Sequence, residues 1–166
     1  MITLRPVQPE DDAFLRAVYA STRAAEMALV DWSTAEKAAF LQMQYDAQRH
    51  HYLTYYPNTT YQVIQRDALD IGRLIVQRPD ASVLLMDMAL LPEQRNQGIG
   101  TYLVQALQTE AAAASKPLRL SVEIFNPALR LYHRLGFTPV EQTGIHLRME
   151  WLPPCPPFAP NNNHAS

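Results

Sequence analysis

The chain has 166 residues, of which 48% are apolar or aromatic and 18% are charged. Because domains usually contain about 100–200 residues, this length and composition predict one domain with a hydrophobic core and exclude a disordered chain. The formal net charge of −2 gives no basic field for binding nucleic acid. A single cysteine, Cys155, excludes an internal disulfide framework and a multi-cysteine zinc site.

The two ends of the sequence bear on localisation and domain boundaries. The N-terminus becomes polar within a few residues, unlike a signal peptide, and no run of about 18 apolar residues could span a membrane. We therefore expect a cytoplasmic protein with no membrane partner. Five of the 13 prolines lie in residues 153–166. This composition predicts an extended, then disordered tail after a folded part over residues 1–152; a partner-binding polyproline II segment is the alternative.

The N-terminal third is predicted to hold one strand and two helices. The strand covers residues 2–7, and Pro9 followed by acidic residues starts the first helix. Ser33 and Glu36 have the spacing of a capping box, which predicts a second helix running to about His51. Three strands follow, over residues 61–65, 71–76 and 83–91.

Short turns between these three strands indicate an antiparallel meander. The third strand is nearly all apolar and is expected to be buried on both faces, with Asp87 as its one charge. After Pro92 the periodicity becomes helical again. The elements expected there are a helix from Ile99 to the alanines at 111–114, a strand over 118–124, a helix from Asn126-Pro127 to Gly136, and strands over 137–140 and 145–151.

The loop Arg-Asn-Gln-Gly-Ile-Gly, residues 95–100, lies between a buried strand and a helix. Glycines allow the backbone to approach a ligand closely, and the free amides of a helix's first turn favour a pyrophosphate. Thr101 and Tyr102 stand where a Walker loop needs Lys and Ser or Thr, and Leu103 replaces the third small residue of a dinucleotide fingerprint. The alternative is a packing turn between strand and helix.

Two blocks resemble the GCN5-related N-acetyltransferases, the GNAT family. Residues 86–103 resemble the acetyl-CoA motif of the family, in which Gln/Arg-x-x-Gly-x-Gly/Ala follows a hydrophobic strand, and residues 122–137 resemble its strand, Asn, helix, Tyr and Leu-Gly-Phe pattern. The order of elements from Ile2 to Trp151 also fits. The resemblance implies a mixed α/β GNAT fold: a central, mostly antiparallel sheet of six to seven strands, splayed in the middle and flanked by about four helices.

The resemblance also implies where acetyl-CoA binds as co-substrate. The cofactor would lie in the splayed part of the sheet, with its pantetheine arm on the backbone of Met88, Ala89 and Leu90. Its pyrophosphate would sit on the amides of Asn96, Gln97, Gly98, Ile99, Gly100 and Thr101. Arg95 would either aid the phosphates or pack the loop. Asn126 matches a family asparagine that contacts the cofactor, although it could instead cap the helix that follows.

The chemistry implied by the resemblance is direct attack of an amine on the thioester in a ternary complex. Tyr132 matches the family tyrosine that acts as general acid, and a phenol is protonated at pH 7; packing in the core is the alternative. Asp87 is the candidate general base, with a hydrogen-bonded structural aspartate or an ordered water as the alternatives.

In this family the first two helices border the acceptor site, and here that region offers aromatic candidates: Trp32, Tyr45, His51 and Tyr55. Ordinary core aromatics of an amphipathic helix are the alternative. No histidine or cysteine spacing indicates a metal site. We therefore expect an acetyl-CoA-dependent N-acetyltransferase acting on a small-molecule or peptide amine, and a homodimer is compatible with the family. The competing hypothesis is a catalytically weak, CoA-binding regulatory module of the same fold.

Overall fold

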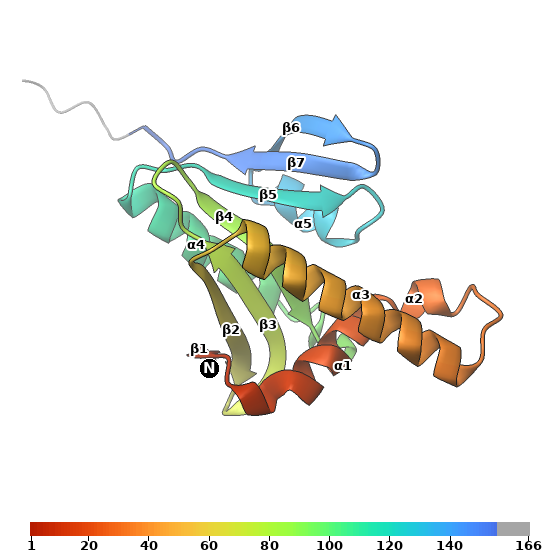
Figure 1. Ribbon diagram of the computed structural model, residues 1–166. Coiled ribbons are helices and arrows are strands. Elements are labelled where there is room, and N and C mark those ends of the chain that lie inside the picture. Colours follow the sequence, from red (N-terminus) through yellow and green to blue (C-terminus); the bar gives the residue numbers. More distant parts are fainter. Residues whose placement is uncertain (156–166) are drawn as a thin grey trace, which may run out of the picture.

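A single seven-stranded sheet forms the centre of the molecule (Figure 1). The computed structural model describes residues 1–155. The strands follow the order β1-β2-β3-β4-β5-β7-β6, and every neighbouring pair is antiparallel except β4 and β5, which are parallel. The strands are β1 Ile2–Pro6, β2 Thr59–Arg66, β3 Leu69–Gln77, β4 Val83–Leu90, β5 Leu118–Glu123, β6 Thr138–Thr143 and β7 His146–Trp151.

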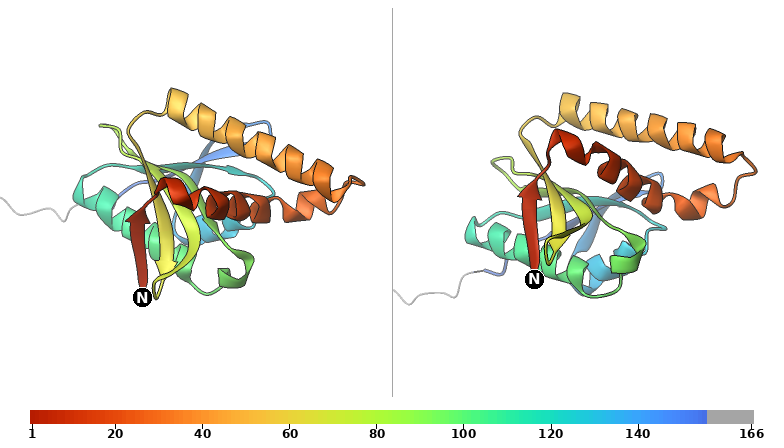
Figure 2. Two further views of the ribbon diagram at one scale, coloured as in Figure 1. Left: turned by 60° about the horizontal axis from the view of Figure 1, so that its bottom comes forward. Right: turned by 90° about the horizontal axis from the view of Figure 1, so that it is seen from below.

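The helices cover both faces of this sheet. Figure 2 shows α1 and α3 on one face and α4 and α5 on the other. The hydrophobic core lies mainly on the second face, where Leu103, Val104 and Leu107 of α4 pack against buried residues of the strands. The helices are α1 Asp12–Thr22, α2 Ala24–Met27, α3 Thr34–Tyr55, α4 Ile99–Ala113 and α5 Ala128–Arg134, with 3-10 turns at Pro9–Asp11 and Pro92–Gln94.

The predicted fold class is confirmed: the sheet is mixed, mostly antiparallel and seven-stranded. Five helices lie in residues 1–155 rather than about four, because α2 is a short extra turn between α1 and α3. None of these helices is both long and apolar enough to cross a membrane. Residues 153–155 of the predicted tail have no regular structure, and residues 156–166 lie outside the described part.

Local sequence signals account for several element ends. The Ser33 hydroxyl accepts a hydrogen bond from the Glu36 amide at 3.1 Å and caps the start of α3. This helix continues to Tyr55, one turn beyond the predicted end at about His51. At the C-terminal end of α5, Gly136 has φ +91°, a left-handed conformation that stops the helix, as predicted.

The expectation that β4 is buried on both faces is wrong. Val83, Leu85 and Ala89 are buried, but the remaining residues of the strand are only partly buried. The reason is that β4 pairs with β3 along most of its length but with β5 only at its start. The rest of the β4 edge is therefore left without a neighbouring strand.

Candidate active site

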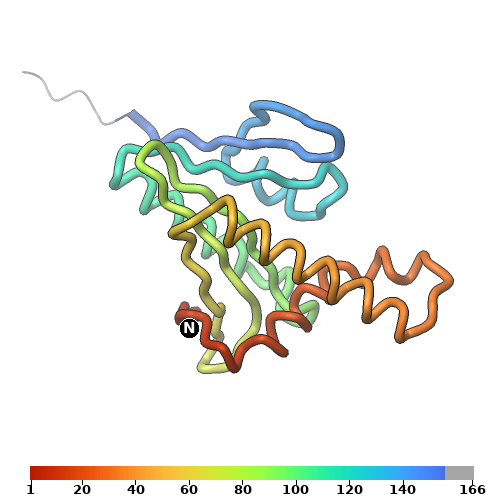
Figure 3. The backbone as a smooth tube through the Cα atoms, in the orientation of Figure 1, coloured from red at the N-terminus to blue at the C-terminus, as the bar shows by residue number. Residues whose placement is uncertain are grey.

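The sheet opens between β4 and β5. Only Val83–Leu85 of β4 pair with Leu118–Leu120 of β5, and beyond these residues the two strands diverge (Figures 1 and 3). A bulge lies at the point of divergence: Leu85 pairs with Val76 and Asp87 with Ile75, so Met86 is an extra residue. Because a bulge bends its strand and ends regular pairing, it accounts for the opening.

Alternate backbone groups of β4 face the opening. The Leu91 amide donates to the Ile71 carbonyl of β3 at 2.9 Å, so by strand alternation the backbone groups of Leu90 and Met88 point away from β3 and into the opening. The Leu90 carbonyl accepts a hydrogen bond from Arg95 Nε at 2.9 Å. Arg95 Nη2 also reaches the Ser21 hydroxyl of α1 at 3.3 Å, so this arginine packs the loop against β4 and α1.

The glycine loop presents free amides to the same opening. Gly98 is the N-cap residue of α4 with φ +81°, and no side chain caps this helix. Among the described residues, the backbone N–H groups of residues 97–101 donate to no protein acceptor. These donors lie at the positive end of a 15-residue helix and form a site for an anion.

The surroundings of the loop favour the same ligand. A Cβ atom added at Gly98 would have no atom within 4 Å, so the space over the loop is open. Two cations reach the loop, since Arg66 donates to the Gln97 side chain and Arg134 Nη2 lies 3.3 Å from the Thr101 hydroxyl. The residues present therefore fit a pyrophosphate group.

Tyr132 enters the site from α5. It is 7% exposed, and its ring packs edge-on against Phe137 at a centroid distance of 5.6 Å. Burial, together with the negative charge of Asp87, raises the pKa of the Tyr132 hydroxyl to about 12. The hydroxyl is therefore protonated at neutral pH, and it makes no hydrogen bond within residues 1–155. Asn126, which precedes α5, accepts a hydrogen bond from the amide of Ala128, the first residue of this helix, at 2.9 Å.

Asp87 forms an ion pair with Arg73 of the adjacent strand, with 2.5 Å between Oδ2 and Nε. Arg73 is 5% exposed and also donates to Gln48 of α3 at 3.0 Å. This is the structural alternative considered for Asp87. Oδ1 has no protein partner within the described part of the chain and remains free to accept a hydrogen bond.

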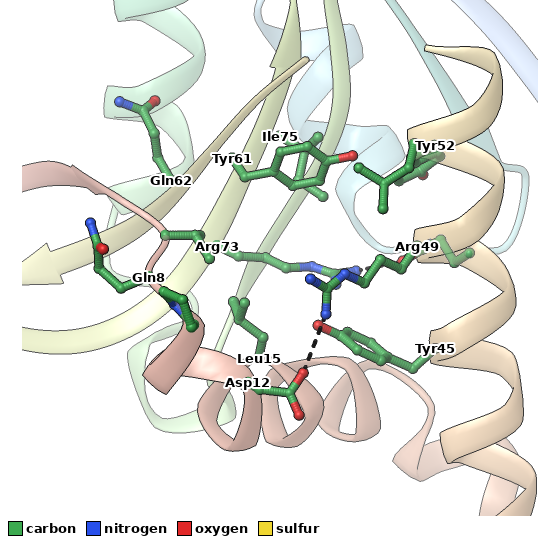
Figure 4. Close-up of a pocket in the computed structure, with 14 residues that line it drawn as sticks. Gln8, Asp12, Leu15, Tyr45, Arg49, Tyr52, Tyr61, Gln62, Arg73 and Ile75 are labelled. Atoms are coloured by element: carbon green, nitrogen blue, oxygen red, sulfur yellow. Dashed lines mark hydrogen bonds and ion pairs between the residues drawn. The ribbon is translucent and has the colours of Figure 1, made fainter. Parts of the chain in front are cut away.

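A cavity of about 220 Å³ lies on the other face, between α1, α3, β2 and β3 (Figure 4). Of the four aromatic acceptor candidates, only Tyr45 lines it. Trp32 packs against Phe40 at 5.1 Å between ring centroids, and His51 stacks on Tyr55 at 4.9 Å, both away from the cavity. Tyr55 is 69% exposed.

The sequence also matches a known family. Residues 57–139 match the family model described as the acetyltransferase (GNAT) domain, half of the chain. The chain belongs to the GNAT family. No curated protein matches the sequence. The matched residues include the bulged strand, the glycine loop and the helix that carries Tyr132, so the family match and the geometry coincide, and the protein is an N-acetyltransferase by family.

Solved structures share the GNAT fold over nearly the whole chain. The PaiA N-acetyltransferase of Thermoplasma acidophilum, in complex with coenzyme A, is 18% identical with a TM-score of 0.69, and the match covers 92% of this chain and 99% of that one. An acetyltransferase of Thermus thermophilus is 20% identical with a TM-score of 0.63, covering 92% and 97%. A GCN5-related N-acetyltransferase of Rhodopseudomonas palustris is 17% identical with a TM-score of 0.64, covering 90% and 94%.

Several residues that line the cavity lie outside the GNAT sequence motifs. Arg73, Arg49 and Tyr61 line the cavity but belong neither to the motifs nor to the aromatic residues around the first two helices, from which the candidates come. One signal was available for Arg73, because it is the one cation in an otherwise apolar strand, as Asp87 is the one charge in the next. The others lie on an exposed helix or a half-buried strand, where their residue types are common.

Proposed function

We propose that the protein transfers an acetyl group from acetyl-CoA to a primary amine of a small molecule or peptide, by direct attack in a ternary complex. One observation supports this proposal above all. The opening between β4 and β5 leads to five backbone amides at the start of α4, those of residues 97–101, that have no partner in the described part of the chain. A sheet edge and an anion site at one end of it match an extended ligand that ends in a pyrophosphate.

Backbone groups would hold the cofactor. The amides of residues 97–101 would bind the pyrophosphate, with Arg66 and Arg134 contributing positive charge. The outward-facing backbone of Met88 would pair with the pantetheine amides, as an added strand pairs with a sheet edge. The Leu90 carbonyl is already bonded to Arg95, so it has one acceptor lone pair left for the same ligand.

Side chains would move the protons. When bound, acetyl-CoA supplies the acetyl group as a reactive thioester. The attacking amine must lose a proton, and Asp87 Oδ1 would accept it directly or through a water, while Arg73 holds Oδ2. The Tyr132 hydroxyl, protonated and free of protein partners among the described residues, would donate to the departing thiolate.

The test is release of the CoA thiol, followed with a thiol reagent, when acetyl-CoA and a broad panel of amines are mixed with the protein. Calorimetric titration with acetyl-CoA is run beside it. The proposal expects micromolar-range binding and release that depends on an amine. Binding with no release from any amine would instead indicate a CoA-binding regulatory module, and absence of binding would contradict both functions.

A further inference from the structure

The cavity between α1 and α3, here called the α1–α3 cavity, is rich in hydrogen-bond donors. The Tyr61 hydroxyl is buried and has no partner in the described part of the chain, and Tyr45 and Tyr52 bring two further hydroxyls to the lining. A buried hydroxyl without a partner is costly and marks a place where a ligand atom can bind. In Figure 4 the Tyr61 side chain points toward Tyr52 across the cavity.

Two arginines enter the same space from opposite walls. Arg73 comes from β3 and Arg49 from α3, and Figure 4 shows both side chains running to the centre of the cavity. Arg49 is 57% exposed, and its contact with Asp12 is long, 3.5 Å between Nη1 and Oδ1. It is therefore free to reorient toward a ligand. Guanidinium groups bind carboxylates through paired N–H donors.

The three tyrosine hydroxyls of the cavity keep their protons and can donate hydrogen bonds. Burial raises the pKa of the Tyr45 and Tyr61 hydroxyls and raises that of Tyr52 to about 12, so all three remain protonated at neutral pH. The charges of Arg49 and Arg73 oppose this shift at both Tyr45 and Tyr61.

Negative charge within the lining is limited and already neutralised. Asp12 is the single carboxylate among the lining residues, and it binds Arg16 Nε at 2.8 Å. Arg73 is also compensated, because Asp87 binds its Nε, so Arg49 is the cation of the described lining with the weakest ion pair. A ligand that supplies an anionic acceptor fits beside Arg49 and the tyrosine hydroxyls.

The cavity borders the proposed reaction centre. Arg73 and Ile75 line it, and in the sheet they pair with Ala89 and Asp87 of β4. Adjacent strands are about 4.8 Å apart and paired residues share a face, so the floor of the cavity is one strand from the β4 edge. A ligand of amino-acid size would bridge from the arginines to Asp87.

We propose that the α1–α3 cavity binds the carboxylate of the acceptor, so that the acceptor class is amines that also bear a carboxylate, such as amino acids. This inference rests on the proposed acetyl transfer. The carboxylate accepts hydrogen bonds from Arg49, Tyr61 and Tyr45, and the amine extends past Arg73 toward Asp87. Positioning by the carboxylate then places the amine for attack.

The experiment compares α- and ω-amino acids of increasing length with their carboxamides, which keep the amine and lose the negative charge. Release of CoA is measured for each pair. Loss of charge-assisted hydrogen bonds reduces binding by roughly tenfold or more, so kcat/KM for the best acid should exceed that of its amide by about that factor. Equal values for acids and amides would overturn the carboxylate inference while leaving acetyl transfer established.

Two variants locate the effect. Tyr61→Phe and Arg49→Gln should each raise KM for the acid about tenfold and leave KM for the amide unchanged. The matched controls are Tyr102→Phe, on α4 at the opposite face, and Arg148→Gln, which is 59% exposed on β7. An equal loss for acid and amide in Tyr61→Phe and Arg49→Gln would overturn the inference. Failure of every amine to release CoA would instead contradict the proposed function, and with it the acceptor role of the cavity.

Discussion

Tyr132 is the residue on which the proposed chemistry depends most. Phe at this position keeps the ring and its contact with Phe137 and removes only the hydroxyl. Because positioned acids contribute about 10²–10⁴ in rate, Tyr132→Phe should lower kcat by roughly 100-fold or more while the Kd of acetyl-CoA changes less than about twofold. Steady-state kinetics and calorimetric titration measure the two quantities.

The matched control for this variant is Tyr56→Phe, which removes a hydroxyl at the C-terminal end of α3. It should leave kcat unchanged. An undiminished kcat for Tyr132→Phe across good substrates would exclude Tyr132 as the acid.

The pH profile provides a separate test of Tyr132. Its pKa of about 12 means that the hydroxyl keeps its proton throughout the working range, while the acceptor amine loses its proton as the pH rises. From pH 7 to 10, kcat/KM should therefore rise and show no falling limb. A descending limb near pH 9 that disappears in Tyr132→Phe would contradict this assignment of the proton.

The two glycines of the loop differ in what they require. Gly98 has φ +81°, where a side chain costs about 1–2 kcal/mol. Gly100 does not have a positive φ, and a Cβ there would meet Leu131 and Met88 at 3.4 and 3.5 Å, close to ordinary contact. Gly98→Ala should lower the free energy of unfolding by about 1 kcal/mol and weaken acetyl-CoA binding several-fold, because it misplaces the free amides.

Gly100→Ala serves as the comparison. It should fold with nearly unchanged stability, since alanine also favours the helix by about 1 kcal/mol. Denaturant unfolding and calorimetric titration of both variants decide the point. The interpretation of the loop fails if Gly100→Ala loses acetyl-CoA binding and Gly98→Ala keeps it.

At the scale of elements, the sequence indicated most of the strands and helices, because each has a local signal. The cap at Ser33, the stop at Gly136 and the alternation in residues 118–122 all correspond to the structure. The bulge at Met86 carried no such signal, since it lies inside a run of apolar residues and depends on the register with β3. The opening of the sheet was expected only from the family resemblance.

Contacts between elements were the part that the sequence could not provide. The ion pair between Arg73 and Asp87 depends on the register of β3 against β4. The α1–α3 cavity is lined by residues as distant in the sequence as Gln8 and Ile75. Aromatic content gave three acceptor candidates on α3, but it did not determine which of their side chains face inward. The register and the helix rotation decide that Tyr45 does and Tyr55 does not.

The 3-10 turn that leads into α1 is held by an acidic side chain with an altered pKa. Asp11 is buried and accepts hydrogen bonds from Arg5 at 2.8 Å and from the Gln8 amide at 2.7 Å, which lower its pKa from 3.8 to about 2. Arg5 also binds Asp70 of β3 at 2.8 Å, so the cluster joins β1, β3 and the 3-10 turn Pro9–Asp11 that leads into α1.

The sign of the resulting pH dependence follows from the lowered pKa. The stabilisation is complete above the unfolded value of about 3.8 and is lost as the pH falls toward 2. Thermal midpoints of the wild type and Asp11→Asn, measured from pH 6 to 2, should therefore differ most at pH 6 and converge in acid. A difference that stays constant over this range would contradict the role given to Asp11.

At the scale of the whole molecule, the sheet separates the hydrophobic core from the α1–α3 cavity. The face covered by α4 and α5 contains the hydrophobic core and the glycine loop, and the face covered by α1 and α3 contains the α1–α3 cavity (Figure 2). The opening between β4 and β5 connects the two at Asp87. This arrangement would bring the cofactor and the acceptor to the reacting atoms from different sides.

A crystal structure with acetyl-CoA tests the arrangement most directly. The prediction is that the pyrophosphate oxygens lie within hydrogen-bond distance of the amides of residues 97–101, that the pantetheine arm pairs with Met88, and that the thioester lies between Asp87 and Tyr132. Acetyl-CoA bound in another place, with the glycine loop and the β4 edge free, would contradict the proposed function.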